Sequence, residues 1–300
     1  MFSVRDILYT PSINFILRSL LKPIKFILPN SLKFPVTGTI KVVWNKNAQL
    51  LLKGNQTCFV SRLLFWDGIY GYDYPVMKIF AELVSQSEVF IDIGANIGYY
   101  SLLAAKLNSN LKVLAFEPSP GAFDFLSDNI KLNNLTNIFP YKMALSNIEG
   151  KLTFYQHSNP KMKELHGQLG GSSSLVLDEE NKDHFQSIEV AATTANKFIQ
   201  SNPLNKIDII KIDTEATEHL VIDGASEILS KFKPIIICEV LKNKIERELE
   251  DIFKRYGYRY FFVSENGLKE INDLNLSTYK EDIFFVHESS IPKIVKYITH

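Results

Sequence analysis

Four acidic side chains stand at the ends of predicted strands, where they could bind a ligand and move a proton. Asp92 ends the run VFID, and Glu117 follows VLAF. Asp213 and Glu215 follow the run IDIIKI. Ligands of open α/β sheets bind beyond the carboxyl ends of the strands. We therefore expect the four carboxylates to face one ligand site.

The turn after the first of these strands narrows the choice of ligand. The stretch VFIDIGANIGYYS places Gly94, Asn96 and Gly98 between a strand and a helix, which brings backbone amides toward a ligand. A dinucleotide-binding turn has the pattern G-x-G-x-x-G, whereas Asn96 and Tyr99 replace two of those glycines. A side chain at position 96 obstructs a pyrophosphate. The turn therefore favours S-adenosylmethionine, which has no phosphate, and we expect NAD not to bind.

Asp92 and Glu117 suit that cofactor. Asp92 is placed to meet the ammonium of the methionine tail. Glu117 lies 25 residues later at the end of the next strand. An acid there can accept hydrogen bonds from both ribose hydroxyls, as acids do in dinucleotide sites. Together with the turn, the two acids predict a nucleoside cofactor.

The pattern of strands and helices predicts the fold class. From about residue 83, β-rich runs alternate with helical runs, which is typical of an α/β fold with a parallel, doubly wound sheet. The last two strands, YRYFFVS and EDIFFVHES, are joined by a turn-rich segment, which favours an antiparallel pair at one edge. Residues 146–186 are interpreted as a β-hairpin and a loop, and residues 35–64 as short strands that include TCFVSRLL.

We divide the chain into two parts. Residues 1–82 hold a basic amphipathic helix and a small β-rich subdomain, and residues 83–300 form the cofactor-binding catalytic domain. In the first part, Arg18, Lys22 and Lys25 share one face of a helix that Pro23 would kink or end. One interpretation is a helix lying on an anionic membrane. The other is a helix packed on the domain, or on a second subunit, with a solvated basic face.

The amino-acid composition narrows the partners and the cellular location that we expect for the protein. Lys and Arg number 33, as do Asp and Glu, so no overall field points to a nucleic-acid partner. Two cysteines, Cys58 and Cys238, are too few for a disulfide framework and suggest a reducing compartment. No stretch reaches the roughly 18 apolar residues of a membrane span, and the first residues do not form a convincing signal peptide. We expect a cytoplasmic protein, with membrane contact through residues 1–30 as an alternative, and leave its oligomeric state open.

At this point the chain resembles the FkbM-type S-adenosylmethionine-dependent methyltransferases, over about residues 60–290. FIDIGANIGYYS and AFEPSP resemble the general cofactor motifs of Rossmann-like class I methyltransferases. MALSN, GGSSSL, IDIIKIDTEATEHLVIDGA and PIIICEV are more specific, although Ala216 stands where the family usually has glycine. The resemblance implies a seven-stranded, mostly parallel sheet with an antiparallel last strand. It also implies these cofactor-binding residues: Asp92, Gly94, Ala95, Asn96, Gly98, Tyr99, Glu117, Pro118, Ala144 and Asp213.

The resemblance implies methyl transfer to an oxygen, often of a sugar or natural product. A protonated hydroxyl is a poor nucleophile, so it needs a base or a metal. Asp213 and Glu215 could supply the base or hold a divalent cation, and Lys211 is interpreted as their charge partner. We favour metal-independent catalysis with Glu215 as base, because Glu215 lies further along the turn. Glu218 is interpreted as an acid that stabilises a helix start.

The acceptor itself is not specified by the sequence. A small molecule, glycan or glycolipid would fit, and the alternatives are methylation of a lipid-linked acceptor at a membrane or a non-catalytic cofactor-binding protein. The irregular region, residues 146–186, should border the acceptor pocket, and it contains His157, His166 and His184. His219 is an additional candidate. An aromatic group could stack on a sugar, and its members are Trp66, Tyr70, Tyr72 and Tyr74.

Overall fold

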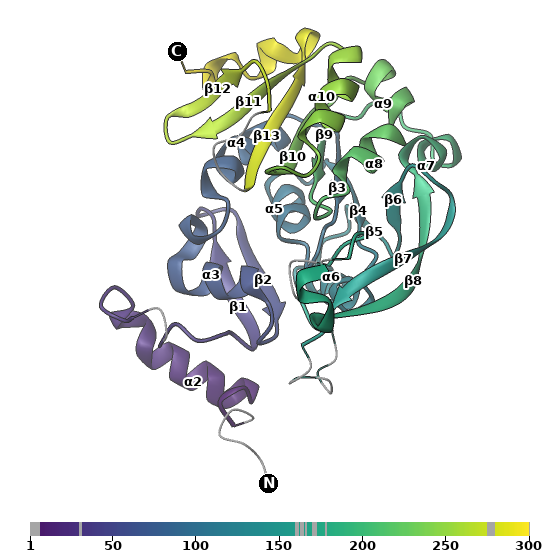
Figure 1. Ribbon diagram of the computed structural model, residues 1–300. Helices are drawn as coiled ribbons and strands as arrows, with labels where there is room; N and C mark the ends of the chain where they lie inside the picture. The colour runs from purple at the N-terminus through teal and green to yellow at the C-terminus, as the bar shows by residue number, and fades with distance from the viewer. Residues whose placement is uncertain are drawn as a thin grey trace.

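The computed structural model has a central sheet of eight strands within the residues that it describes (Figure 1). The described residues are 7–29, 32–159, 162, 165, 167–169, 173–177, 179–274 and 280–299. In spatial order the strands are β12 (Gly267–Ile271), β11 (Tyr258–Ser264), β13 (Lys280–His287), β10 (Ile235–Leu241), β9 (Ile209–Ile212), β3 (Val89–Ile93), β4 (Lys112–Phe116) and β5 (Ile138–Tyr141).

The directions of the strands confirm the α/β class. The five strands from β10 to β5 run parallel, and β13 is inserted antiparallel between β10 and β11. The sheet has one strand more than the seven expected, because β12 forms within the turn-rich segment before β13. Ser264 pairs with Gly267 across Glu265 and Asn266, which is a two-residue hairpin.

Helices cover both faces of the sheet. Alternate residues of each strand enter two separate apolar clusters: Phe90 and Phe284 belong to one, and Ile91 and Phe285 to the other. This is the period of two expected of strands that are buried on both sides. The first cluster packs against α4 (Tyr74–Val84), α5 (Tyr99–Leu107) and α6 (Pro120–Leu132). The second packs against α7 (Ala195–Ser201), α8 (Glu218–Asp223), α9 (Ser226–Lys231) and α10 (Glu246–Arg255).

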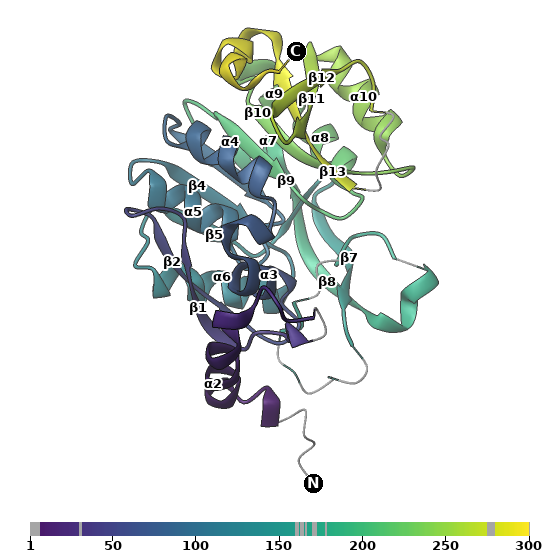
Figure 2. The same cartoon turned by 90° about the vertical axis from the view of Figure 1, so that its left-hand side faces the viewer.

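A smaller sheet stands beside the central one (Figure 2). In it β7 (Gly150–His157) pairs antiparallel with β8 (Phe185–Thr194), and β6 (Ala144–Ser146) pairs parallel with β8. The strand expected at KLTFYQH is present as β7, but its antiparallel partner β8 lies almost wholly beyond the expected residues 146–186. Part of the connection between β7 and β8 lies outside the described residues. The described residues also form short 3₁₀ helices: η1 (Lys22–Ile24), η3 (Gly68–Gly71), η5 (Glu179–His184), η6 (Glu288–Lys293) and η7 (Val295–Tyr297).

The N-terminal part combines a helix, a hairpin and a second helix. These are α2 (Pro11–Leu21), the pair β1 (Gly38–Val43) and β2 (Gln49–Gly54), and α3 (Phe59–Asp67). The strand expected at TCFVSRLL is wrong, because this stretch begins α3. The Cys58 sulfur accepts the Ser61 N–H at 3.4 Å as an N-cap, and Val60 and Leu64 are buried one turn apart.

The expected boundary after residue 82 falls inside α4. Residues on both sides of it share an apolar cluster, which includes Leu52 and Phe90. The division into 1–82 and 83–300 stays a prediction. Cys58 and Cys238 are buried free thiols. In the part of the chain that the structure describes, each helix is too short or too polar to cross a membrane.

Candidate functional site

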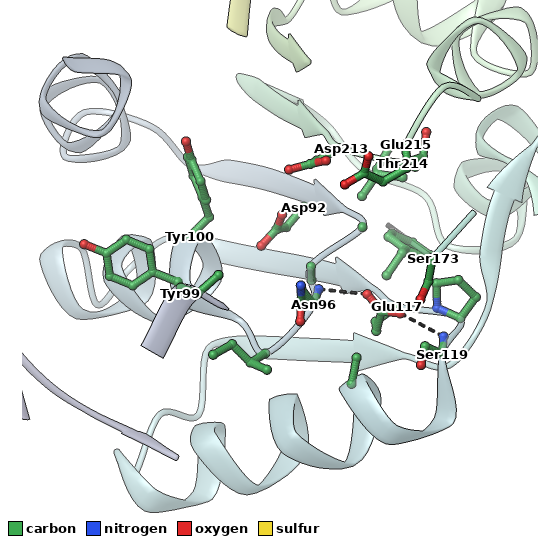
Figure 3. A pocket seen from close by; sticks show the side chains of 18 of the residues that line it. Asp92, Asn96, Tyr99, Tyr100, Glu117, Ser119, Ser173, Asp213, Thr214 and Glu215 are labelled. Atoms are coloured by element: carbon green, nitrogen blue, oxygen red, sulfur yellow. Dashed lines mark hydrogen bonds between the residues drawn. The ribbon is translucent and has the colours of Figure 1, made fainter. Parts of the chain in front are cut away.

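The carboxyl ends of the parallel strands open into a cavity of about 350 Å³ (Figure 3). All four acids singled out from the sequence line it: Asp92, Glu117, Asp213 and Glu215. So do Lys211 and the predicted cofactor residues Gly94, Ala95, Asn96, Tyr99, Pro118 and Ala144. Gly98 is not in the lining. It precedes α5 with φ 92°, and a Cβ there would collide with the Leu126 side chain.

The turn after β3 uses the left-handed backbone region three times. Gly94, Asn96 and Gly98 have φ values of 81°, 51° and 92°. A Cβ at Gly94 would collide with the carbonyl oxygen of Asp213, so the turn presses against the end of β9. Asn96 tolerates this region better than most residues, and its Oδ1 is buried in the cavity wall without a hydrogen-bond partner among the described residues. The turn therefore holds a buried acceptor, beside the cavity, whose hydrogen-bonding capacity is unfilled.

Glu117 is held by two backbone amides. Its Oε2 accepts the Asn96 N–H, and its Oε1 accepts the Ser119 N–H, both at 2.8 Å (Figure 3). Burial raises the pKa of Glu117 to about 7, although the two amides act in the opposite direction. The carboxylate is therefore fixed in place but short of donors, which is the state that ligand hydroxyls would relieve.

Asp92 is equally buried. The Ser101 hydroxyl donates to its Oδ2 at 2.6 Å, and burial raises the pKa of Asp92 to about 6. An ammonium group of a ligand would favour the charged form. Two buried carboxylates and the free Asn96 oxygen thus make a site rich in acceptors. These acceptors need hydrogen-bond donors from a ligand, and the ribose hydroxyls and ammonium of S-adenosylmethionine are such donors.

A second group of acids faces the same cavity. Carboxylate oxygens of Asp213, Glu215 and Glu239 all lie within 4.8 Å of one another. Glu239 was missed in the sequence, where PIIICEV was noted only as a family-specific motif. Its meeting with Asp213 follows from the order of the sheet, because β10 is the parallel neighbour of β9 and both acids lie near the carboxyl ends of their strands.

Lys211 lies beneath this acidic group. Its side chain is buried, and its Nζ lies 3.6 Å from Asp213 Oδ2 and 3.0 Å from Asp282 Oδ1. Burial alone would lower the pKa of Lys211, but Asp282 and Asp213 hold it well above its usual value. An ammonium cannot accept a proton, so this arrangement agrees with a charge partner and not with a base.

The turn after β9 also enters the left-handed region, but without glycine. Glu215 has φ 53° and Ala216 has φ 73°. The backbone at Ala216 therefore takes the conformation that glycine favours, despite the side chain. Ser174 steadies the turn, since its hydroxyl donates to the Glu215 carbonyl oxygen at 2.5 Å. Glu218 begins α8, is buried, and accepts the Thr214 N–H at 2.8 Å.

The aromatic candidates separate clearly. Tyr72 lines the cavity, and its ring meets the Tyr99 ring edge-on with centroids 6.0 Å apart. Trp66 is buried and donates from its indole nitrogen to the Phe34 carbonyl oxygen at 3.0 Å, so it has a core role. Tyr70 and Tyr74 pack on each other outside the lining, with ring centroids 4.4 Å apart.

The three histidine candidates that the structure describes do not line the cavity. His157 and His184 have ring centroids 6.3 Å apart, and neither belongs to the described lining. His219, in α8, is also absent from that lining. His166 lies outside the described residues.

Comparison with known proteins supplies a family. The model of a family described as the methyltransferase FkbM domain matches residues 92–260. A tRNA(Phe) (4-demethylwyosine(37)-C(7)) aminocarboxypropyltransferase of Methanocaldococcus jannaschii is 24% identical over 220 residues, which cover 70% of this chain and 81% of the relative.

Two further relatives are named methyltransferases. Methyltransferase sdnD of Sordaria araneosa is 28% identical over 193 residues, covering 54% of this chain and 71% of the relative. Hexuronic acid methyltransferase AglP of Haloferax volcanii is 24% identical over 165 residues, covering 55% of this chain and 61% of the relative.

Proposed function

We propose that this chain, which belongs to the methyltransferase FkbM family and is an S-adenosylmethionine-dependent methyltransferase, methylates a hydroxyl of a sugar, glycan or natural product. The observation that carries the proposal is the position of the acidic group Asp213, Glu215 and Glu239 in the same cavity as Asp92 and Glu117. One end of the cavity suits a nucleoside with an ammonium, and the other suits a group that must lose a proton. A relative named for hexuronic acid supports a sugar acceptor.

The cofactor end has assigned residues in this proposal. Glu117 accepts hydrogen bonds from the ribose hydroxyls, and Asp92 accepts them from the ammonium of the methionine tail. Asn96 offers its buried Oδ1 to a remaining donor. When bound, S-adenosylmethionine supplies an electrophilic methyl group. The chain contributes by fixing the positions of both partners, which is a large part of catalysis in such reactions.

The acceptor end manages the proton. We assign Glu215 as the general base, whose carboxylate takes the hydroxyl proton of the acceptor. Of the three carboxylates, Asp213 is held by Lys211 as an ion pair at 3.6 Å and Glu239 is buried within β10. Glu215, on the turn after β9, is therefore our choice. Tyr72 forms part of the wall against which a sugar ring could pack.

A divalent cation is the alternative to a general base. Three carboxylates within 4.8 Å are hard oxygen ligands of the kind that Mg²⁺ takes. The buried ammonium of Lys211 would repel a cation at the same carboxylates, which favours the base. Activity that EDTA abolishes and Mg²⁺ restores would instead assign these acids as metal ligands.

The proposal can be tested with two labels. The chain is incubated with sugar and hexuronic acid glycosides and with S-adenosylmethionine carrying tritium in the methyl group or carbon-14 in the amino-acid tail. We expect only the methyl label to enter the acceptor, in a bond that resists mild alkali, as a methyl ether does. Transfer of the tail label would indicate aminocarboxypropyl transfer. Release by alkali would indicate a methyl ester, and either result would contradict hydroxyl methylation.

A further inference from the structure

Helix α2 packs with its polar residues toward the protein. Asn14 is fully buried: its amide nitrogen donates to the Pro35 carbonyl oxygen at 3.0 Å, and its Oδ1 accepts the Thr37 N–H at 3.0 Å. Arg18, one turn later, is 2% exposed and donates to the Thr39 carbonyl oxygen at 2.8 Å. The basic face expected from the sequence is therefore turned inward at Arg18.

The opposite side of α2 and the residues that follow it are apolar and face outward. Nine of the nineteen exposed large hydrophobic side chains among the described residues lie between residues 7 and 27. Leu20, Phe26 and Ile27 are 69%, 88% and 80% exposed. A helix that only covers a domain buries its apolar side instead. Figures 1 and 2 both show α2 at the periphery, away from the central sheet.

The charge around this surface identifies a partner. Residues 7–29 contain Arg18, Lys22 and Lys25 and no acidic residue. Lys22 and Lys25 lie between the exposed Leu20 and the exposed Phe26 and Ile27. A second copy of the chain docked on the same face would bring these lysines near their own counterparts. Apolar side chains flanked by lysines instead match an anionic lipid surface.

We propose that α2 and η1 dock this protein on anionic membranes, with Leu20, Phe26 and Ile27 inserted among the lipids and Lys22 and Lys25 against the headgroups. The surface adjoins the catalytic side of the molecule through α3. The Phe65 ring lies 5.0 Å from the Arg18 guanidinium and 4.4 Å from Lys22 Nζ, while Phe59 and Leu63 of the same helix line the cavity. The proposal does not depend on which acceptor is methylated.

Co-sedimentation with vesicles tests this without any acceptor. The whole chain is mixed with vesicles of phosphatidylcholine alone or of phosphatidylcholine with phosphatidylglycerol. We expect sedimentation with the anionic vesicles, weakened by salt. The triple variant Leu20→Ser/Phe26→Ser/Ile27→Ser should bind the anionic vesicles at least about tenfold more weakly, because the apolar contact with the lipids is lost.

Two controls make the test decisive. Ile148→Ser/Val295→Ser removes exposed apolar side chains elsewhere and should leave sedimentation unchanged. Lys22→Glu/Lys25→Glu should remove the preference for anionic vesicles. Equal binding by the triple variant and the unaltered chain would overturn the proposal. So would a lipid-free dimer that dissociates on Leu20→Ser, since the face would then cover a second copy.

Discussion

The turns after β3 and β9 lie side by side and both enter the left-handed backbone region, yet they are built from different residues. The first places Gly94 and Gly98 at two of its three positive φ values, whereas the second places Glu215 and Ala216 there. A left-handed residue with a Cβ costs about 1–2 kcal/mol. Strain of this kind concentrates at functional sites. In the proposed function, the first turn receives the cofactor and the second holds the general base.

The largest effect is expected from the second turn. Glu215→Gln keeps the shape of the side chain but removes the base, and should lower turnover by about 10²–10⁴, the range for general acid–base catalysis. Affinity for the cofactor, measured by calorimetry, should hardly change. Glu149→Gln, at an exposed acid, is the control and should leave turnover intact. Full turnover in Glu215→Gln would leave Glu215 with only a helix-start role.

Gly94→Ala should be the most damaging change in the first turn. Position 94 has φ 81°, and the Cβ of the alanine would collide with the Asp213 carbonyl oxygen. Left-handed strain and overpacking together should therefore lower the free energy of unfolding by about 2–5 kcal/mol. Cofactor binding should weaken with it. Gly68→Ala separates the two causes, since Gly68 has φ 71° and open space around a Cβ. Equal losses in the two variants, measured by denaturant unfolding, would show that the contact with Asp213 does not matter.

Glu117→Ala should weaken cofactor binding by about 1.5–3 kcal/mol, the scale of a charge-assisted hydrogen bond.

The pKa of Glu117 in the free protein is raised to about 7 by burial. Ribose hydroxyls donate to the ionised carboxylate, so at lower pH binding must first displace a proton. Affinity should therefore fall as the pH drops below about 7. Calorimetry of Glu117→Gln, which cannot ionise, should show weaker binding without this pH dependence.

The smallest effect is expected at Ala216. Ala216→Gly removes a Cβ from a residue at φ 73° and should raise the free energy of unfolding by up to about 1 kcal/mol. Thermal unfolding measures the change. Activity should be retained, because the side chain of Glu215 is unaltered. A destabilised Ala216→Gly protein would mean that the turn after β9 is not strained at this position.

Local signals were enough to predict that Asp92, the glycine turn and Glu117 would lie at one site. Asp92, the glycine turn and Glu117 each belong to one strand and the turn after it, so periodicity and turn chemistry were enough. The acidic group depends on contacts between distant strands. Lys211 meets Asp282 from β13, and Glu239 comes from β10, so their meeting required the order of the sheet. The strand expected at TCFVSRLL failed because a cap at Cys58 and burial of Val60 and Leu64 outweighed β propensity.

The additional strand β12 has a consequence for association between molecules. A sheet edge offers unpaired backbone groups to any other chain, and long apolar edges promote aggregation. Without β12, the edge would be β11, whose run YRYFFVS is rich in aromatic residues. Strand β12 covers this edge with the shorter run GLKEI. In this run Lys269 and Glu270 are exposed, and Glu270 forms an ion pair with Arg259. The outer strand of the hairpin therefore offers a neighbouring molecule a shorter and more charged edge than β11 would.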